Sequence, residues 1–456
     1  MFATPFFSSR RHLAMFSLVL LFTAALPSQQ PVHPSLLLLS IDGLKPEAVL
    51  DAEAHGLKLP NLRALVHDGV SSQGVTGVLP TLTYPSHTTL LTGASPAHHG
   101  IIANTTFDPY NRNQQGWYWY AEDIKMPTLW DAAHAAGLPT ANVYWPVSVG
   151  AAGIDFNLPQ IWRANTEDDL KLQRAVATPG LEPSLVKALG RYPGGEEETI
   201  DADEIRTRFA VRLLETRHPA FFTVYLTGLD TEQHASGPFS PKANAVLERL
   251  DALVGILLAA AQHDNPGHAF FAVVSDHGFA PVQHDVNLYS AFTSHGFLKL
   301  DANHKIVAWT ASPWPAGGSA GIMLSNPADG ATRSQVEAML KELASDPANG
   351  IDKILTGAQA RAQGGFPDAA FFVSFKIGYE LGYQFTPPLV TEPTNLGMHG
   401  YLPSNPEMRS SFFLVGPGIT PGSTFGQIDM RSIAPTLAKT LHIPLPSAEL
   451  PPLVLP

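Results

Sequence analysis

The 456-residue chain contains no cysteine. This absence excludes disulfide bonds, thiolate metal ligands and thiol nucleophiles, so a bound metal would be held by His, Asp, Glu or hydroxyl groups. Basic residues are also scarce, with 28 Lys and Arg against 40 Asp and Glu and a formal net charge of −12. That balance argues against a nucleic-acid polymer or an anionic membrane as the main partner. A small anionic substrate stays possible, because bound metal ions can reverse the local potential.

Long apolar runs are absent after the N-terminus, so no membrane span is expected in the mature chain. The N-terminus carries Arg10 and Arg11 followed by an apolar run from Leu13 to Leu26. We therefore interpret residues 1–30 as a signal peptide for export to the periplasm or the cell exterior. The arginine pair also loosely matches a twin-arginine signal, although Ala14 weakens that match, so the export route stays open.

Length and composition predict a folded chain with a large core. Hydrophobic residues make up 45% and charged residues 15% of the chain, which is ordinary for globular proteins. The 40 prolines indicate many loops, and no internal repeats are seen. These features leave the oligomeric state undetermined.

Three continuous apolar runs predict buried parallel strands: Ser35–Ile41, Pro219–Leu226 and His268–Ser275. The polar residues that follow them are Asp42, Asp230 with His234, and Asp276 with His277. In open α/β sheets ligands gather at the carboxyl ends of the strands, so these side chains are candidate metal ligands. The alternative for the first of them is a helix cap. The pattern predicts an α/β fold with a central, mostly parallel sheet flanked by helices.

The stretch Leu79–Gly93 predicts a loop that runs into a helix, because Pro85 suits a first helical turn. A hydroxyl at such a place lies near backbone N–H groups and the positive end of the helix dipole. This location suits an alkoxide nucleophile or a bound phosphate. Thr81, Thr83 and Ser86 are the candidates, with helix capping as the alternative for each.

Asn104 is a candidate amide donor for an oxyanion, with turn formation as the alternative. His98 and His99 are adjacent on a turn, where side chains usually point in different directions, and a structural role is favoured for both. His399, between Met and Gly, is a further ligand candidate far along the chain.

The chain changes character between residues 284 and 396, where short strands and a helix predict a small inserted α+β subdomain. The main domain is then expected to combine residues 31–283 with 397–456. From about residue 146 to 200 the sequence is punctuated by Pro, Gly and Glu and predicts no clear element.

The candidate ligands form one set of carboxylates, imidazoles and a hydroxyl: Asp42, Thr83, Asp230, His234, Asp276, His277 and His399. Such a set cannot cluster without cations, because its carboxylates repel one another. Two divalent ions resolve this repulsion, and borderline N/O ligands suit zinc best, with manganese, cobalt or iron as alternatives. Two ions roughly 4 Å apart stabilise the attacking and leaving oxygens of phosphoryl transfer.

Seven sequence blocks together resemble the nucleotide pyrophosphatase/phosphodiesterase family of the alkaline phosphatase superfamily. They are Ser40-Ile41-Asp42-Gly43, Pro80-Thr81-Leu82-Thr83-Tyr84-Pro85-Ser86-His87, His99-Gly100-Ile101-Ile102-Ala103-Asn104, Tyr144-Trp145-Pro146, Asp230-Thr231-Glu232-Gln233-His234, Ser275-Asp276-His277-Gly278 and Met398-His399-Gly400. The blocks occur in the family's order and span nearly all of the mature chain. The resemblance implies an alkaline-phosphatase-like fold and the chemistry of an exported two-zinc phosphodiesterase or nucleotide pyrophosphatase.

The resemblance also implies roles for individual residues. One zinc would be bound by Asp42, Asp276 and His277 with Thr83 on its open side, and the other by Asp230, His234 and His399. Thr83 would attack the phosphorus of a small phosphodiester or nucleotide substrate, and the phospho-threonine intermediate would then be hydrolysed. Asn104 and the backbone N–H that follows Thr83 would hold a non-bridging oxygen.

Departures from related families bear on the substrate. Trp145-Pro146-Val147 stands where threonine-nucleophile phosphomonoesterases carry a Lys-x-Arg clamp, which favours diesters over monoester dianions. The absence of cysteine and of a Cys-x-Pro-x-Arg motif excludes sulfatases. Tyr84 and Tyr225 lie where nucleotide-cleaving members place rings that sandwich a base, with ordinary packing as the alternative.

Two alternatives to this function stay open. One is an alkaline phosphomonoesterase or phosphonate hydrolase on the same scaffold. The other is a metal-binding protein without turnover. Within the leading hypothesis, lysophospholipids and phosphocholine compounds compete with nucleotides as substrates, and neither the natural substrate nor the metal in the cell follows from the sequence.

Overall fold

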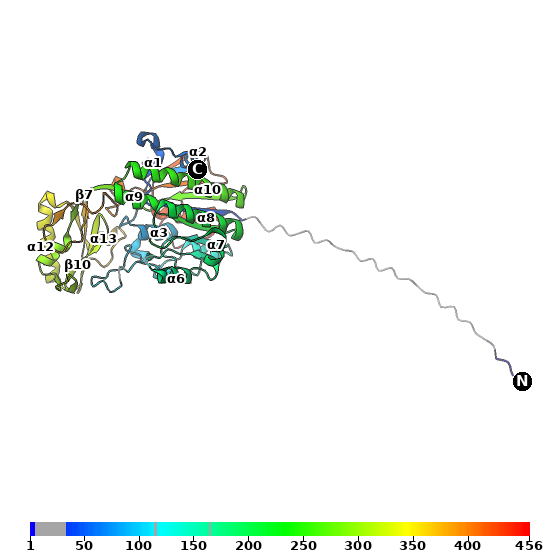
Figure 1. Cartoon of the computed structure of the whole chain (residues 1–456), viewed down its shortest axis with the longest axis horizontal. Coiled ribbons are helices and arrows are strands. Elements are labelled where there is room, and N and C mark those ends of the chain that lie inside the picture. The colour runs from blue at the N-terminus through cyan, green and yellow to red at the C-terminus, as the bar shows by residue number, and fades with distance from the viewer. Residues whose placement is uncertain (5–32, 114–115, 164–165) are drawn as a thin grey trace. The chain divides into compact units, whose positions relative to one another are not determined.

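The computed structural model describes residues 1–4, 33–113, 116–163 and 166–456 (Figure 1). The predicted signal peptide, residues 1–30, lies outside the described residues except for residues 1–4. Among the described residues, no helix is both long enough and apolar enough to cross a membrane. The fold described below belongs to the compact unit His33–Pro456.

The main sheet of this unit has eight strands in the part of the chain that the structure describes. Their order is β18 (Ser423–Asp429), β2 (Val70–Thr76), β17 (Phe412–Val415), β6 (Ala269–Val274), β1 (Ser35–Ile41), β5 (Phe221–Leu226), β3 (Thr140–Val143) and β4 (Phe156–Leu158). All neighbours are parallel except that β17 runs antiparallel to both β2 and β6. The predicted mostly parallel central sheet is therefore confirmed.

The three predicted apolar strands form the centre of this sheet. β1 lies between β6 and β5, with Leu38 opposite Ala272 on one side and Thr223 on the other. These strands are buried along nearly their whole length, because helices cover the sheet, and this explains why the sequence shows unbroken apolar runs instead of alternation. The shared direction brings the carboxyl ends of β1, β5 and β6 to one edge of the sheet.

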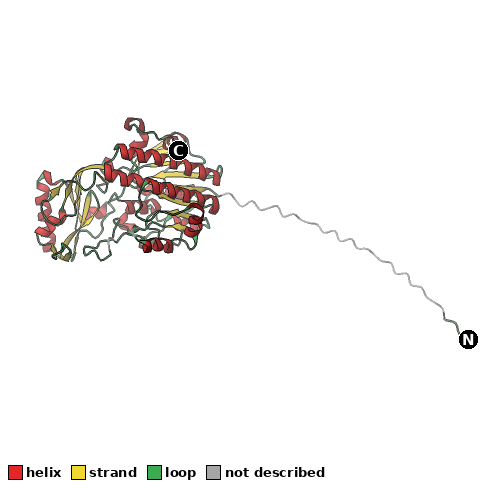
Figure 2. Ribbon diagram, viewed as in Figure 1, coloured by secondary structure: helices red, strands yellow, loops and turns green. Residues whose placement is uncertain are grey.

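Helices flank the sheet, as Figure 2 shows. They are α1 (Pro46–Leu50), α2 (Pro60–Asp68), α3 (Thr83–Thr92), α4 (Pro96–His99), α5 (Leu129–Ala135), α6 (Glu167–Val176), α7 (Leu181–Leu189), α8 (Ile200–Arg217), α9 (Gly228–Ser236), α10 (Pro241–Asp264) and α14 (Ile433–Thr440). The long helix α10 packs against α8, α9 and α2, whereas α3 packs against α4, α5 and α14. The segment 146–200, for which the sequence predicted no element, contains β4, α6 and α7.

Smaller sheets occupy the segment between β6 and β17. One sheet consists of β10 (Ala311–Pro315), β11 (Ser319–Leu324), β13 (Phe371–Phe375) and β12 (Ile351–Thr356). A second sheet consists of β14 (Gly378–Leu381), β7 (Ala280–Val286), β15 (Val390–Thr391) and β16 (Gly397–Met398). A third consists of β8 (Leu298–Leu300) and β9 (Ile306–Trp309). Helices α11 (Leu288–Ser294), α12 (Gly330–Ser345) and α13 (Gly357–Ala362) accompany them. These elements share a hydrophobic core separate from that of the main sheet. The division into a catalytic domain and an inserted subdomain at residues 284–396 stays a prediction.

Candidate metal centre

The residues predicted from the strand ends converge at one edge of the main sheet. Asp42 follows β1, Asp276 and His277 follow β6, and Thr83 begins helix α3. The imidazole Nε2 of His277 lies 3.4 Å from Asp42 Oδ1 and 3.1 Å from Asp276 Oδ2. The Thr83 hydroxyl lies 3.4 Å from the same nitrogen. The first predicted ligand group, Asp42 with Asp276 and His277, therefore forms one compact cluster in which ligand atoms lie within 4.8 Å of one another.

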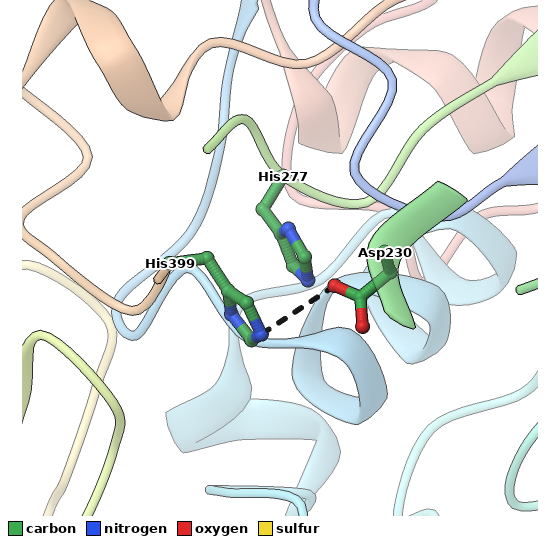
Figure 3. Close-up of side chains that lie close together, drawn as sticks. All are labelled: Asp230, His277 and His399. Carbon is green, nitrogen blue, oxygen red and sulfur yellow. Dashed lines mark ion pairs between the residues drawn. The ribbon is translucent and has the colours of Figure 1, made fainter. Parts of the chain in front are cut away.

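A second cluster shares its imidazole with the first. Asp230, on α9, lies with His277 and His399 so that one ligand atom from each falls within 4.8 Å of the others. Figure 3 shows His399 turned toward the Asp230 carboxylate, and the Nε2–Oδ1 distance is 3.8 Å. The rings of His277 and His399 are stacked, with centroids 3.6 Å apart.

His234 lies beside the second cluster, close to the Asp230 carboxylate oxygen that His399 does not face. Its Nε2 lies 3.4 Å from Asp230 Oδ2, one helical turn away on α9. The sequence grouped His234 with Asp230 and His399, whereas the three-residue group whose ligand atoms lie within 4.8 Å of one another contains His277 in its place. The distances thus leave His277 shared between the two clusters, and the assignment of His234 to the second ion stays a prediction.

Backbone carbonyls fix the orientation of all three imidazoles. The Nδ1 atom of His234 lies 2.9 Å from the Gly397 carbonyl oxygen, that of His399 lies 3.2 Å from Thr81 O, and that of His277 lies 3.1 Å from its neighbour's carbonyl. A carbonyl oxygen only accepts, so each Nδ1 carries the proton and donates. Each Nε2 is then left with its lone pair directed at the carboxylates, which is the arrangement that a metal ligand needs.

Electrostatics show that the cluster is incomplete without a cation. Burial raises the pKa of Asp42, and the neighbouring carboxylates of Asp230 and Asp276 raise it further. Burial lowers the pKa of His234 to about 4 and that of His399 to about 3, so both rings stay neutral near pH 7. One carboxylate oxygen of each aspartate is buried without a hydrogen-bond partner in the described residues. Neutral nitrogens and unpaired carboxylate oxygens are the donor set of a zinc-type site, so these residues fit two divalent ions.

The Thr83 hydroxyl lies where the helix begins, and the whole of α3 is buried. The backbone N–H of Tyr84 donates to Asn104 Oδ1 at 2.9 Å. This bond differs from the expectation that both groups hold a substrate oxygen, because the Tyr84 N–H is already engaged. The bond orients the Asn104 amide so that its Nδ2 is the remaining donor beside Thr83. The other candidate hydroxyl, Thr81, donates to the Tyr401 carbonyl at 2.7 Å, in keeping with a structural role.

The two predicted aromatic residues are both almost fully buried, each with about 1% of its surface exposed. Tyr225 donates its hydroxyl to Asp42 Oδ2 and thereby orients a carboxylate of the first cluster. Tyr84 packs against Trp117 with ring centroids 5.1 Å apart. Both line the cavity at the cluster, and a stacking role for either stays a prediction.

A cavity of about 570 Å³ opens over Thr83 and the two clusters. Its wall includes side chains that the sequence analysis did not single out: Trp117, Gln160, Trp162, Glu196, Glu198, Tyr383 and Asn395. Trp117 and Trp162 stack with centroids 4.6 Å apart. The sequence offered no periodic signal for this wall, because loop residues show no periodicity. His98 and His99 do not line the cavity, which agrees with the structural role favoured for them.

The comparisons with known proteins agree with this fold. A family model described as type I phosphodiesterase/nucleotide pyrophosphatase matches residues 36–402. The chain therefore belongs to the type I phosphodiesterase/nucleotide pyrophosphatase family, and the predicted family is confirmed.

Individual relatives are similar over different parts of their length. Ectonucleotide pyrophosphatase/phosphodiesterase family member 3 of Rattus norvegicus is 28% identical over 257 residues, which cover 54% of this chain and 25% of the relative. An uncharacterized pyrophosphatase/phosphodiesterase of Schizosaccharomyces pombe is 25% identical over 410 residues, or 88% of this chain and 74% of the relative. The solved structure of inactive murine ectonucleotide pyrophosphatase/phosphodiesterase 5 in complex with AMP superposes with a TM-score of 0.65. The superposition covers 92% of this chain and 96% of the murine chain, at 18% sequence identity. This confirms the predicted alkaline-phosphatase-like fold.

Proposed function

We propose that the chain is an exported, two-zinc phosphodiesterase or nucleotide pyrophosphatase that acts through a phospho-threonine intermediate. The observation that carries this proposal is the meeting of two metal-ligand clusters at one hydroxyl, that of Thr83. Export rests on the sequence of residues 1–30 alone. N-terminal sequencing of the protein recovered outside the cytoplasm tests it, because an uncleaved chain retained in the cytoplasm contradicts export.

The first chemical step is an in-line displacement at phosphorus. The Thr83 hydroxyl loses its proton and its oxygen forms a bond to phosphorus while the bond to the leaving oxygen breaks, and that oxygen takes up a proton. Water later cleaves the bond between Thr83 and phosphorus and releases the phosphomonoester. Two divalent ions at these ligands would lower the pKa of the hydroxyl and offset the charge that develops on the phosphoryl oxygens. Asn104 donates its Nδ2 hydrogens to a non-bridging oxygen, and its orientation is held by the Tyr84 N–H.

The charge of the cavity wall supports a diester or anhydride over a monoester. Among the described residues that line the cavity, none is Lys or Arg. Trp145 and Val147, at the position of the Lys-x-Arg clamp of phosphomonoesterases, are fully buried and present no charge. A monoester dianion would therefore carry one negative charge without a matching partner.

A nucleotide is the substrate class that the cavity favours. Trp117, Trp162 and Tyr84 bring aromatic rings into the same cavity as Thr83, and flat heteroaromatic rings gain from stacking on such side chains. The solved structure of inactive murine ectonucleotide pyrophosphatase/phosphodiesterase 5 is a complex with AMP. The net charge of −12 and the cavity of about 570 Å³ match a small nucleotide and not a nucleic-acid polymer.

The test compares steady-state rates of the zinc-loaded protein on three substrates: the para-nitrophenyl ester of thymidine 5′-monophosphate, bis(para-nitrophenyl) phosphate and para-nitrophenyl phosphate. We expect kcat/KM to be higher for the diesters, and Thr83→Ala to abolish turnover while metal content is preserved. A clear preference for the monoester contradicts the first choice. Absence of turnover in the metal-loaded wild type supports a non-catalytic metal-binding protein instead.

A further inference from the structure

A buried histidine on helix α3 bonds to the residue that carries the candidate nucleophile. His87 is fully buried and lies one helical turn after Thr83. Its Nδ1 lies 2.8 Å from the Thr83 carbonyl oxygen, and its Nε2 lies 2.9 Å from Ser40 Oγ. The carbonyl oxygen only accepts, so Nδ1 carries the proton and donates, and Nε2 accepts from the Ser40 hydroxyl. Both ring nitrogens are thus engaged, and His87 neither lines the cavity nor belongs to a metal-ligand cluster.

The proton of His87 is directed at this carbonyl and not at the nearest carboxylate. Asp276 Oδ2 lies 3.6 Å from Nδ1, which is beyond hydrogen-bond distance. Burial lowers the pKa of His87, against the opposing effect of the Asp276 carboxylate, so the ring is neutral near pH 7. A neutral imidazole offers one donor and one acceptor, and these match the Thr83 carbonyl and the Ser40 hydroxyl.

The Thr83 carbonyl belongs to a peptide group that is held at both ends. This planar group consists of the C=O of Thr83 and the N–H of Tyr84. The N–H donates to Asn104 Oδ1 at 2.9 Å, while the C=O accepts from His87. Because the peptide plane begins at the Thr83 Cα, its orientation determines where the Thr83 hydroxyl can lie. The bond from His87 therefore acts on the hydroxyl and, through the same plane, on the Asn104 amide.

The other side of the ring is tied to the strand that supplies Asp42. Ser40, the partner of His87 Nε2, lies in β1 just before Asp42. The His87 ring also packs edge-on against Tyr225, with centroids 4.4 Å apart, and Tyr225 donates its hydroxyl to Asp42 Oδ2. Protein interiors are close-packed, so these contacts hold the start of α3 at a fixed place beside the end of β1. His87 thus links the Thr83 hydroxyl to the first cluster.

Burial of a histidine does not by itself indicate such a role. His99 on α4 is also fully buried. Its ring bonds to the Thr89 hydroxyl of α3, to the Pro85 carbonyl and to the Ile101 N–H. None of these bonds reaches the peptide group of Thr83 or strand β1. His99 therefore offers a matched control, a buried imidazole that holds the same helix by other groups.

We propose that His87 is a positioning residue, whose Nδ1–H fixes the Thr83 hydroxyl for attack on phosphorus without touching the substrate. This inference adds a residue to the proposed function and rests on its Thr83 nucleophile. A displacement of the attacking atom by about 1 Å lowers the rate about a hundredfold. Such a displacement slows the attack and leaves substrate binding in place, so kcat should fall while KM is unchanged.

The experiment compares two amide variants of the zinc-loaded full chain on the para-nitrophenyl ester of thymidine 5′-monophosphate. In His87→Asn the amide nitrogen can take the place of Nδ1 and donate to the Thr83 carbonyl, whereas in His87→Gln the amide lies at the place of Nε2. We expect His87→Asn to keep kcat within about fivefold of the wild type and His87→Gln to lose about a hundredfold. KM and metal content should be unchanged in both. His99→Gln should keep the wild-type kcat, although loss of a buried imidazole lowers the Tm of all three variants.

The outcomes that overturn the inference differ from the failure of the proposed function. Equal kcat in His87→Asn and His87→Gln, whether lowered or unchanged, shows that the Nδ1–H bond does not position the hydroxyl. A loss in His99→Gln as large as in His87→Gln assigns the effect to the packing of α3 instead. A wild type without turnover overturns the proposed function. The inferred bond is then decided by ¹H–¹⁵N NMR of histidine-labelled protein, with the His87 signals assigned by their absence in His87→Asn, because a proton on Nε2 instead of Nδ1 contradicts it.

Discussion

Two groups of charged side chains are buried at the main sheet, and they differ in how their charge is neutralised. Asp203 and Arg206 on α8 are both fully buried, with Arg206 Nη1 3.0 Å from Asp203 Oδ1. Asp203 also accepts from the backbone N–H groups of Thr227 and Gly228, and Arg206 donates to the Glu197 carbonyl at 2.8 Å. The charges of this group cancel within the chain.

The metal-ligand clusters show the opposite pattern. Asp42, Asp230 and Asp276 bring three carboxylates together with imidazoles whose lowered pKa keeps them neutral, and no cationic side chain of the described residues balances them. Each aspartate keeps an unpartnered oxygen. A fold stabilises a self-neutralised pair without help, whereas the clusters are complete only with cations from outside. A buried charge by itself therefore does not indicate a functional site. A buried charge that the chain leaves without a partner does.

Removing divalent ions should give the largest difference between the metal-ligand clusters and the Asp203–Arg206 pair. Dialysis against a chelator removes the charge that the clusters need and leaves Asp203–Arg206 untouched. We expect kcat/KM on the nucleotide diester to fall at least about ten-thousandfold, roughly 5 kcal/mol of transition-state stabilisation. Zinc should restore it, and circular dichroism should show that the fold persists. Full activity at less than about 0.1 metal ion per chain would contradict a metal-dependent site.

Breaking the self-neutralised pair should cost stability instead of chemistry. Arg206→Met leaves Asp203 buried without its partner, and we expect the free energy of unfolding in urea to fall by about 3–5 kcal/mol. The double variant with Asp203→Leu should recover much of this loss, because two apolar side chains replace both charges. A single-variant loss below about 1 kcal/mol would show that the pair is not the structural element inferred here.

Neutralising a carboxylate of the metal-ligand clusters should raise the free energy of unfolding of the metal-free protein, whereas breaking the Asp203–Arg206 pair lowers it. In the metal-free protein, Asp42→Asn removes one of three mutually repelling buried carboxylates, and we expect unfolding to require about 1–2 kcal/mol more. In the zinc-loaded protein the same variant loses a ligand, so its stability gain on metal addition should be smaller than that of the wild type. Thermal unfolding with and without zinc measures both. A metal-free variant less stable than the wild type refutes the repulsion argument.

The clustering of these aspartates could be predicted from the sequence because its signal is local. Each of Asp42, Asp230 and Asp276 follows an unbroken apolar strand, and parallel strands bring such positions to one edge. The spacing of Asp230 and His234 likewise indicated one helical face. The presence of His277 in both clusters could not be predicted, since it depends on distances between segments that are far apart in the sequence.

The cavity wall could not be predicted for the same physical reason. Gln160 and Glu198 are 38 residues apart, and both come from a segment in which the sequence predicted no element. A contact between loop residues carries no periodicity, and its polar side chains look like solvated surface until the fold buries them. The engagement of the Tyr84 N–H by Asn104, 20 residues later, was hidden in the same way.

Glu449 offers the test with the smallest expected effect. Its carboxylate is only partly buried, and other residues of the chain donate hydrogen bonds to it. Burial alone would raise the pKa of Glu449, but hydrogen bonds from the Ser95 N–H and hydroxyl, His98 and Arg431 lower it to about 2. A depressed folded pKa contributes stability above the unfolded value of about 4.5, and this contribution disappears as the pH falls toward 2. Glu449→Gln should therefore destabilise the protein at pH 7 by less than about 1 kcal/mol, since partly exposed ion pairs are screened.

The pH dependence distinguishes this carboxylate from those of the metal clusters. Urea unfolding of the wild type and Glu449→Gln between pH 7 and pH 3 should give curves that converge as the pH drops below about 4.5, because Glu449 of the unfolded chain takes up a proton there while the folded carboxylate, with its pKa of about 2, stays charged. A difference that stays constant over this range would mean that Glu449 acts through packing alone. Convergence, combined with stabilisation of the metal-free protein by Asp42→Asn, would show that the sign of a carboxylate's effect depends on whether the chain itself supplies its partner.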